Sequence, residues 1–126
     1  MVSPLHTIGV VDDDPVFAAI AKLLLFSLGQ HNAALIDNTP ADIARFALSG
    51  NPQSLLITGL ALQTMDGLSV MRELSKSGYT GWVAIAGNDS DNVSESAARL
   101  ATLLGMRFAG SIAKPVREQD MITILQ

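Results

Sequence analysis

Residues 54–67 read Ser-Leu-Leu-Ile-Thr-Gly-Leu-Ala-Leu-Gln-Thr-Met-Asp-Gly, an apolar run that ends at Gly59 and leads into a loop. The run Leu55–Thr58 is short and bounded by turn-forming residues, which predicts a buried strand. The next segment, Leu68–Ser75, has helical periodicity and is followed by Gly78, where we expect the helix to stop. The stretch therefore predicts a strand, a loop and a helix in succession.

The same alternation continues in both directions along the chain. The predicted strands are His6–Val11, Ala33–Ile36, Leu55–Thr58, Trp82–Ala86 and Arg107–Ala113. The predicted helices are Pro15–Leu28, one from the N-cap Thr39 and Pro40 to about Leu48, Leu68–Ser75, one from Ser90 or Asp91 to Leu104, and one from Val116 to Gln126. Strands that alternate with helices indicate an α/β fold with a doubly wound parallel sheet.

Two of these helices carry an apolar stripe that we expect to face the core. The stripes are Phe17, Ile20, Leu24 and Leu28 in the first helix, and Val93, Ala97, Leu100 and Leu104 in the fourth. Gly29 and Gly105 follow these two helices, in the position where a glycine commonly ends a helix.

Composition limits the classes of function that the chain can have. At 126 residues and 13.3 kDa we expect a single domain over residues 1–126. The net charge of −4, with eight scattered Lys and Arg residues, argues against binding to nucleic acid. No apolar run approaches the roughly 18 residues that cross a membrane, and the absence of cysteine excludes disulfides and thiolate metal sites. We expect a cytoplasmic protein that is not bound to membranes.

Charged residues follow the first and the fifth predicted strands. In an open parallel sheet, ligands bind outside the carboxyl ends of the strands. Asp12, Asp13 and Asp14 come directly after the first strand, where adjacent carboxylates can bind a hard cation such as Mg²⁺. Asp14 also fits the role of N-cap for the helix that begins at Pro15. Lys114 follows the fifth strand at the same edge of the sheet.

Three segments, Val10–Pro15, Ser54–Gly67 and Ser111–Pro115, together resemble response-regulator receiver domains of the CheY-like type. The resemblance extends over essentially the whole chain. It implies a flavodoxin-like (βα)5 sandwich of three layers, with strand order 2-1-3-4-5. It also implies that Asp12 and Asp13 form an acidic pocket, that Lys114 is the cation of this pocket, and that Pro115 follows a cis peptide bond.

Three residues depart from the receiver pattern along the route of the phosphorylation signal. Gly59, seven residues before Asp66, stands where receivers carry the aspartate that accepts the phosphoryl group. Ala86 replaces the Ser or Thr whose hydroxyl binds a phosphoryl oxygen, and Ser111 replaces an aromatic residue that changes rotamer on activation. Glycine cannot form an acyl phosphate, so the resemblance implies a receiver that has lost its switch.

The resemblance therefore implies a degenerate receiver, or pseudo-receiver, that acts as a regulatory and interaction module in bacterial two-component phosphorelay signalling and is not itself an enzyme. We expect no cofactor, with Mg²⁺ binding at Asp12 and Asp13 weak at most. Lys114 is then expected to pair with Asp12 or Asp13. The expected partner surface, formed by the fourth helix, the fifth strand and the fifth helix, would contact an output domain, a protein partner or a second copy in a homodimer.

The segments Ala97–Arg107 and Gly110–Pro115 further resemble receivers that precede EAL-type cyclic-di-GMP phosphodiesterase domains. Two alternatives remain. One is a small-ligand-binding flavodoxin-like module in which the space left by Gly59 holds an anion or a nucleotide, although the acidic loop after the first strand opposes anions. The other is an ordinary receiver whose acceptor aspartate was replaced by engineering.

Overall fold

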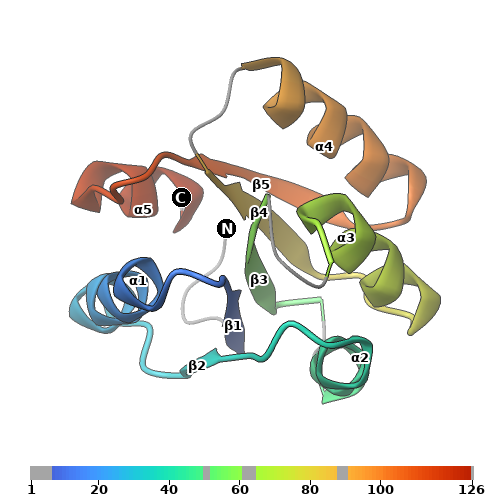
Figure 1. Ribbon diagram of the computed structural model, residues 1–126, viewed down its shortest axis with the longest axis horizontal. Helices are drawn as coiled ribbons and strands as arrows, with labels where there is room; N and C mark the ends of the chain where they lie inside the picture. The colour runs from blue at the N-terminus through green and yellow to red at the C-terminus, as the bar shows by residue number, and fades with distance from the viewer. Residues whose placement is uncertain (1–6, 50–51, 61–64, 88–90, 126) are drawn as a thin grey trace.

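The computed structural model describes residues 7–49, 52–60, 65–87 and 91–125, and in 91–94 only the backbone. The strands are β1 (Ile8–Val11), β2 (Ala33–Leu35), β3 (Leu55–Gly59), β4 (Trp82–Ala86) and β5 (Arg107–Ile112). The helices are α1 (Pro15–Ser27), α2 (Pro40–Ser49), α3 (Gly67–Lys76), α4 (Asp91–Leu103) and α5 (Glu118–Leu125). Strands and helices alternate along the chain, as the sequence pattern predicts (Figure 1).

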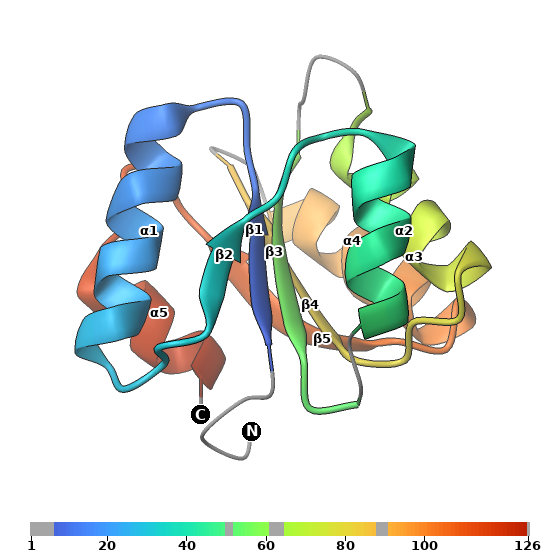
Figure 2. The same ribbon diagram turned by 90° about the horizontal axis from the view of Figure 1, so that it is seen from below.

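The five strands form one parallel sheet in the order β2-β1-β3-β4-β5. Helices α1 and α5 cover one face of the sheet, and α2, α3 and α4 cover the other (Figure 2). The predicted fold class and strand order are confirmed. Strands β2 and β5 lie at opposite edges of the sheet.

The core has two parts because both faces of a parallel sheet are covered. The part under α1 and α5 is centred on buried side chains including Phe17, Leu25, Ile57, Ile112 and Met121. The part under α2, α3 and α4 is centred on others including Ile43, Leu56, Met71, Leu74 and Ile85. The central strand β3 is buried along its whole length and contributes side chains to both parts.

Side chains cap the starts of α1 and α2, as the sequence predicts. Asp14 accepts hydrogen bonds from the backbone nitrogens of Val16 and Phe17 at the start of α1. The Thr39 hydroxyl accepts a hydrogen bond from the backbone nitrogen of Asp42 at the start of α2. These caps use backbone donors that have no partner inside the helix.

The predicted start of the fifth helix is wrong. Helix α5 begins at Glu118 rather than Val116, because the first turn closes on the Arg117 carbonyl, which accepts hydrogen bonds from Asp120 and Met121. Val116 instead packs from the preceding loop against the core under α1. Strand β1 begins at Ile8, and the predicted start at His6 lies outside the described residues.

The predicted core stripe of α1 is also partly wrong. Ile20 is 41% exposed, and the residues that face the core are Phe17, Ala18, Ala21 and Leu25, with Leu24 and Leu28 partly buried at the side. In α4, Ala97 is buried and Leu100 and Leu104 pack partly against the core, whereas the side chain of Val93 is not described. No helix in the described part of the chain is long and apolar enough to cross a membrane.

Candidate functional site

The register of the sheet brings four strand ends together. Val11 of β1 pairs with Thr58 of β3, and Gly59 pairs with Ala86 of β4. Ala86 in turn pairs with Ile112 of β5. The residues that follow these positions therefore meet at the carboxyl edge of the sheet, where the sequence placed the site.

An ion pair joins the end of β1 to the segment after β5. Lys114 Nζ lies 2.9 Å from each carboxylate oxygen of Asp12, although only Oδ1 has hydrogen-bond geometry. The Asp12 side chain is 2% exposed and that of Lys114 is 23% exposed. The pair is therefore mostly removed from water, where a charge needs a partner. Of the two aspartates expected near Lys114, Asp12 makes this contact.

The neighbours of the pair hold both side chains in place. Asp12 Oδ1 also accepts a hydrogen bond of 2.9 Å from the backbone nitrogen of Asp14. Lys114 Nζ lies 4.8 Å from the centroid of the Phe17 ring, a cation–π contact from α1 that the sequence patterns did not indicate. The Lys114–Pro115 peptide bond is cis, as expected. Asp13 is exposed beside this arrangement.

Gly59 is buried, and its carbonyl is enclosed by its neighbours. The Thr58 hydroxyl donates a hydrogen bond of 3.1 Å to the Gly59 oxygen. Gly67, at the start of α3, lies so close that a Cβ atom there would be 2.6 Å from the same oxygen. Gly67 also donates its backbone N–H to the Leu60 oxygen at 2.8 Å. A glycine at position 67 thus allows α3 to begin directly over the end of β3.

The two other departures from the receiver pattern lie on β4 and β5. Ala86 is fully buried beside Gly59 and contributes a methyl group where a hydroxyl would be needed to bind a phosphoryl oxygen. Ser111 is exposed on β5 and pairs with Ile85 in the sheet register. The carboxyl edge therefore presents small side chains around the position of Gly59.

The described residues at this edge bring a cationic side chain, rather than a set of oxygen ligands, to Asp12. Mg²⁺ requires oxygen ligands in octahedral geometry. Both oxygens of Asp12 already face the ammonium group of Lys114, and Gly59 has no side-chain donor. Across the described residues, no group of three or more His, Cys, Asp or Glu side chains is arranged to hold a metal ion.

The sequence matches no protein-family model and no curated protein. Its structure is similar to a response regulator from Colwellia psychrerythraea, with a TM-score of 0.75 and 25% identity over 96% of this chain and 93% of that one. The chain has the receiver-domain fold. Chemotaxis protein CheY4 of Vibrio cholerae is also similar, with a TM-score of 0.72, 13% identity and 97% coverage of both chains.

A third similar structure is the signal receiver domain of a modulated diguanylate cyclase from Desulfovibrio desulfuricans. Its TM-score is 0.62, with 18% identity over 96% of this chain and 90% of that one. The receiver fold therefore accounts for nearly the whole chain. Gly59 and Ala86 lie at the ends of β3 and β4, and Lys114 lies in the segment after β5.

Proposed function

We propose that this chain is a degenerate receiver that serves as a phosphorylation-independent regulatory and interaction module in bacterial two-component signalling. The observation that carries the proposal is Gly59, which lies buried at the carboxyl end of β3, between the ends of β1 and β4. A carboxylate at this position would lie among the ends of β1, β3 and β4. Glycine offers no atom to which a phosphoryl group can be transferred.

The Asp12–Lys114 pair supports a single fixed state of the site. In the absence of a carboxylate at position 59, Lys114 is held by Asp12 and by the Phe17 ring. The pair connects the end of β1 to the segment after β5. These two segments are therefore held together by side chains of the protein itself, without a phosphoryl group or a cation. The buried methyl group of Ala86 also argues against a phosphorylated state, because a methyl group cannot bind a phosphoryl oxygen.

We further propose that α4, β5 and α5 contact the output domain or a protein partner. Strand β5 is an edge strand, and its residues from Arg107 to Gly110 are half-buried rather than enclosed. The finer proposal is that the output is an EAL-type cyclic-di-GMP phosphodiesterase. Its support is the resemblance of the segments around α4 and β5 to such receivers, together with the similar receiver from a diguanylate cyclase.

The proposal is tested by incubating the chain with acetyl phosphate and Mg²⁺ and measuring its intact mass. We expect no adduct, because no carboxylate is available at position 59. The matched variant is Gly59→Asp, which adds only the missing carboxylate and shows whether the rest of the site can still support transfer. An adduct of one phosphoryl group on the unaltered chain, at any residue, would contradict the proposal.

The coding sequence that follows Gln126 tests the finer proposal. An EAL domain in the same reading frame would support it, and an output domain of another class would contradict it. Neither result affects the proposed loss of phosphorylation, which depends on Gly59 alone.

A further inference from the structure

Exposed apolar side chains gather at one edge of the molecule. Among the described residues, five of the seven large apolar side chains that are exposed lie on α1 and β2, namely Val16, Ile20, Leu23, Phe26 and Leu35. Helix α1 has a single charged residue, Lys22, and is apolar on the face opposite the core as well as on the core face. A helix that is apolar all round is normally buried. This edge is therefore expected to be covered by another protein surface.

Strand β2 leaves backbone groups at the same edge. Among the strands of the described chain, β2 pairs only with β1. The Asn32 carbonyl accepts a hydrogen bond from Ile8, and Ile36 donates one to Val10, so the backbone groups of these two residues point toward β1. Because backbone direction alternates along a strand, Ala33 and Leu35 point their N–H and C=O groups to the outer edge.

The outer edge of β2 is short, with three residues, but it lacks the charged residues, prolines and bulges that commonly prevent pairing. Natural edge strands are blocked by lysine, proline or bulges. Residues 32–36 read Asn-Ala-Ala-Leu-Ile and contain no charge and no proline. The edge is therefore able to accept another strand.

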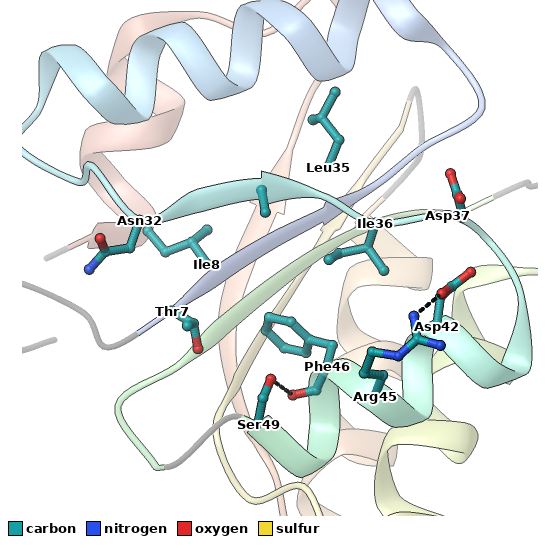
Figure 3. A pocket seen from close by; sticks show the side chains of 11 residues that line it. Thr7, Ile8, Asn32, Leu35, Ile36, Asp37, Asp42, Arg45, Phe46 and Ser49 are labelled. Carbon is teal, nitrogen blue, oxygen red and sulfur yellow. Dashed lines mark hydrogen bonds and ion pairs between the residues drawn. The ribbon is translucent and has the colours of Figure 1, made fainter.

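A cavity adjoins β2 on each face of the sheet. On the α1 side, a cavity of about 420 Å³ is lined by residues that include Leu23, Phe26, Ala33, Leu35, Lys22 and His31. On the α2 side, a cavity of about 310 Å³ is lined by residues of β2 and α2 that include Ile36, Phe46, Asp42 and Arg45. Figure 3 shows Leu35 on the α1 side of β2 and Ile36 on the α2 side.

We propose that the α1–β2 edge is a homodimer interface, in which β2 pairs antiparallel with β2 of a second copy around a two-fold axis at Ala34. The two sheets then form one continuous sheet of ten strands. Ala33 of each copy lies opposite Leu35 of the other, and these residues exchange backbone hydrogen bonds because both point outward. Ala34 lies opposite itself in a pair without hydrogen bonds.

The side chains of this register are complementary. Leu35 of the second copy lies beside the small Ala33 and enters the apolar cavity that Leu23 and Phe26 line. Counting outward from Ala34, the carboxylate of Asp37 in the second copy lies opposite His31, which lines that cavity together with the positively charged Lys22. The two-fold axis repeats each of these contacts. A second copy is therefore the occupant that size and charge favour.

The interface needs the helices as well as the strands. A specific interface buries about 800 Å² on each partner, more than three strand residues can supply. Helix α1 lies beside β2 (Figure 2), and its exposed Leu23 and Phe26 line the same cavity as Leu35 and extend the contact. Strand β5 lies at the opposite edge of the sheet, so the dimer leaves the proposed output surface accessible. The dimer does not depend on the proposed loss of phosphorylation.

A single cysteine at the two-fold axis tests the register. The natural chain contains no cysteine, so Ala34→Cys introduces the only thiol. In an antiparallel pair without hydrogen bonds, the facing Cα atoms are about 4.5 Å apart, which lies within the range that a disulfide spans. We expect mild oxidation to convert most of this variant to a covalent dimer, and Leu103→Cys, on α4, to remain largely monomeric. Equal cross-linking of both variants, or cross-linking of Leu103→Cys alone, would overturn the proposal.

Sedimentation of the full chain supplies the second test. We expect the unaltered chain to form a dimer, and Leu35→Glu to shift it to a monomer by placing a carboxylate in the apolar cavity. Leu103→Glu is the matched control because Leu103 is 83% exposed and lies on α4. Circular dichroism checks that both variants remain folded. A chain that is monomeric at the highest soluble concentration would overturn the proposal, and so would a dimer that only Leu103→Glu dissociates.

Discussion

Lys114 and Asp12, 102 positions apart in the chain, form a partly buried ion pair in which Nζ lies 2.9 Å from each carboxylate oxygen. Its two members belong to segments at the ends of β1 and β5, which are not neighbours in the sheet. The pair therefore bridges over the end of β3, where Gly59 has no side chain. The contact thus joins two opposite charges that are partly buried and that lie far apart in the chain.

Replacing Lys114 with alanine should destabilise the fold. Asp12 is 2% exposed and would remain as a buried carboxylate without its cation. Breaking a fully buried pair costs about 3–5 kcal/mol, but Lys114 is partly exposed and water can enter the space it leaves. We expect a loss of about 1–3 kcal/mol in the free energy of unfolding, measured by urea denaturation.

A double-mutant cycle assigns this loss to the pair. Asp12→Asn removes the charge that Lys114 compensates, so Lys114→Ala should cost less in that background. Asp13→Asn is the matched control, since it removes the same charge from the exposed neighbour of Asp12. Additive losses for Lys114 and Asp12 would show that the contact is not energetically coupled.

Restoring a carboxylate at position 59 should restore part of the cation site. Gly59→Asp places a second acidic group beside Asp12 and gives a divalent cation the oxygen ligands that it prefers. We expect calorimetry at about millimolar Mg²⁺ to detect binding to Gly59→Asp and none to the unaltered chain. Gly59→Asn is the control of equal size, and binding to it would attribute the effect to shape rather than charge.

The sequence predicts the fold well because the alternation of apolar runs and amphipathic segments is clear, and because the inner strands β1, β3 and β4 are almost entirely buried. It also predicts that Asp12 and Lys114 meet, since both follow strands of one parallel sheet. It leaves open whether Asp12 or Asp13 makes the contact. That choice depends on how the backbone turns after Val11, where the strand pattern no longer applies.

The contact between Lys114 and Phe17 was not predictable, because it depends on how α1 lies across the sheet. The same limit applies to the outer face of α1. Since Ile20 and Leu23 are as apolar as the residues that face the core, periodicity alone does not show which face is exposed.

Asp66 should contribute to stability through its position at the start of α3. Its Oδ1 accepts a hydrogen bond of 2.7 Å from the backbone nitrogen of Ser69, and this bond holds the pKa of Asp66 below its usual value. Loss of such a cap costs about 1 kcal/mol. We expect Asp66→Ala to lower the free energy of unfolding by that amount at neutral pH, measured by urea denaturation.

The pH dependence of this effect follows from the sign of the shift. Because the pKa of Asp66 is lower in the folded state, its charged form contributes stability above about pH 4, the unfolded value. This contribution is lost as the pH falls through the pKa that Asp66 has in the folded state, which is the lower of the two values. The difference between the unaltered chain and Asp66→Ala should therefore shrink in acid. The difference between Asp66→Asn, which caps without a titrating group, and Asp66→Ala should stay constant with pH. A constant difference between the unaltered chain and Asp66→Ala would refute the argument.

Tyr79 provides a probe of the core under alkaline conditions. It is the chain's only tyrosine, it is 2% exposed, and its hydroxyl donates a hydrogen bond of 2.8 Å to the Trp82 carbonyl. Burial raises the pKa of Tyr79 well above its usual value. The neutral ring thus contributes stability that is fully present below about pH 10, the unfolded value, and is lost as the pH rises toward the folded pKa.

We expect the absorbance of tyrosinate to appear only together with the loss of the circular-dichroism signal. Tyr79→Phe should remove the part of the alkaline destabilisation that this ionisation causes. Reversible ionisation near pH 10 in a chain that stays folded would show that the ring is accessible to water.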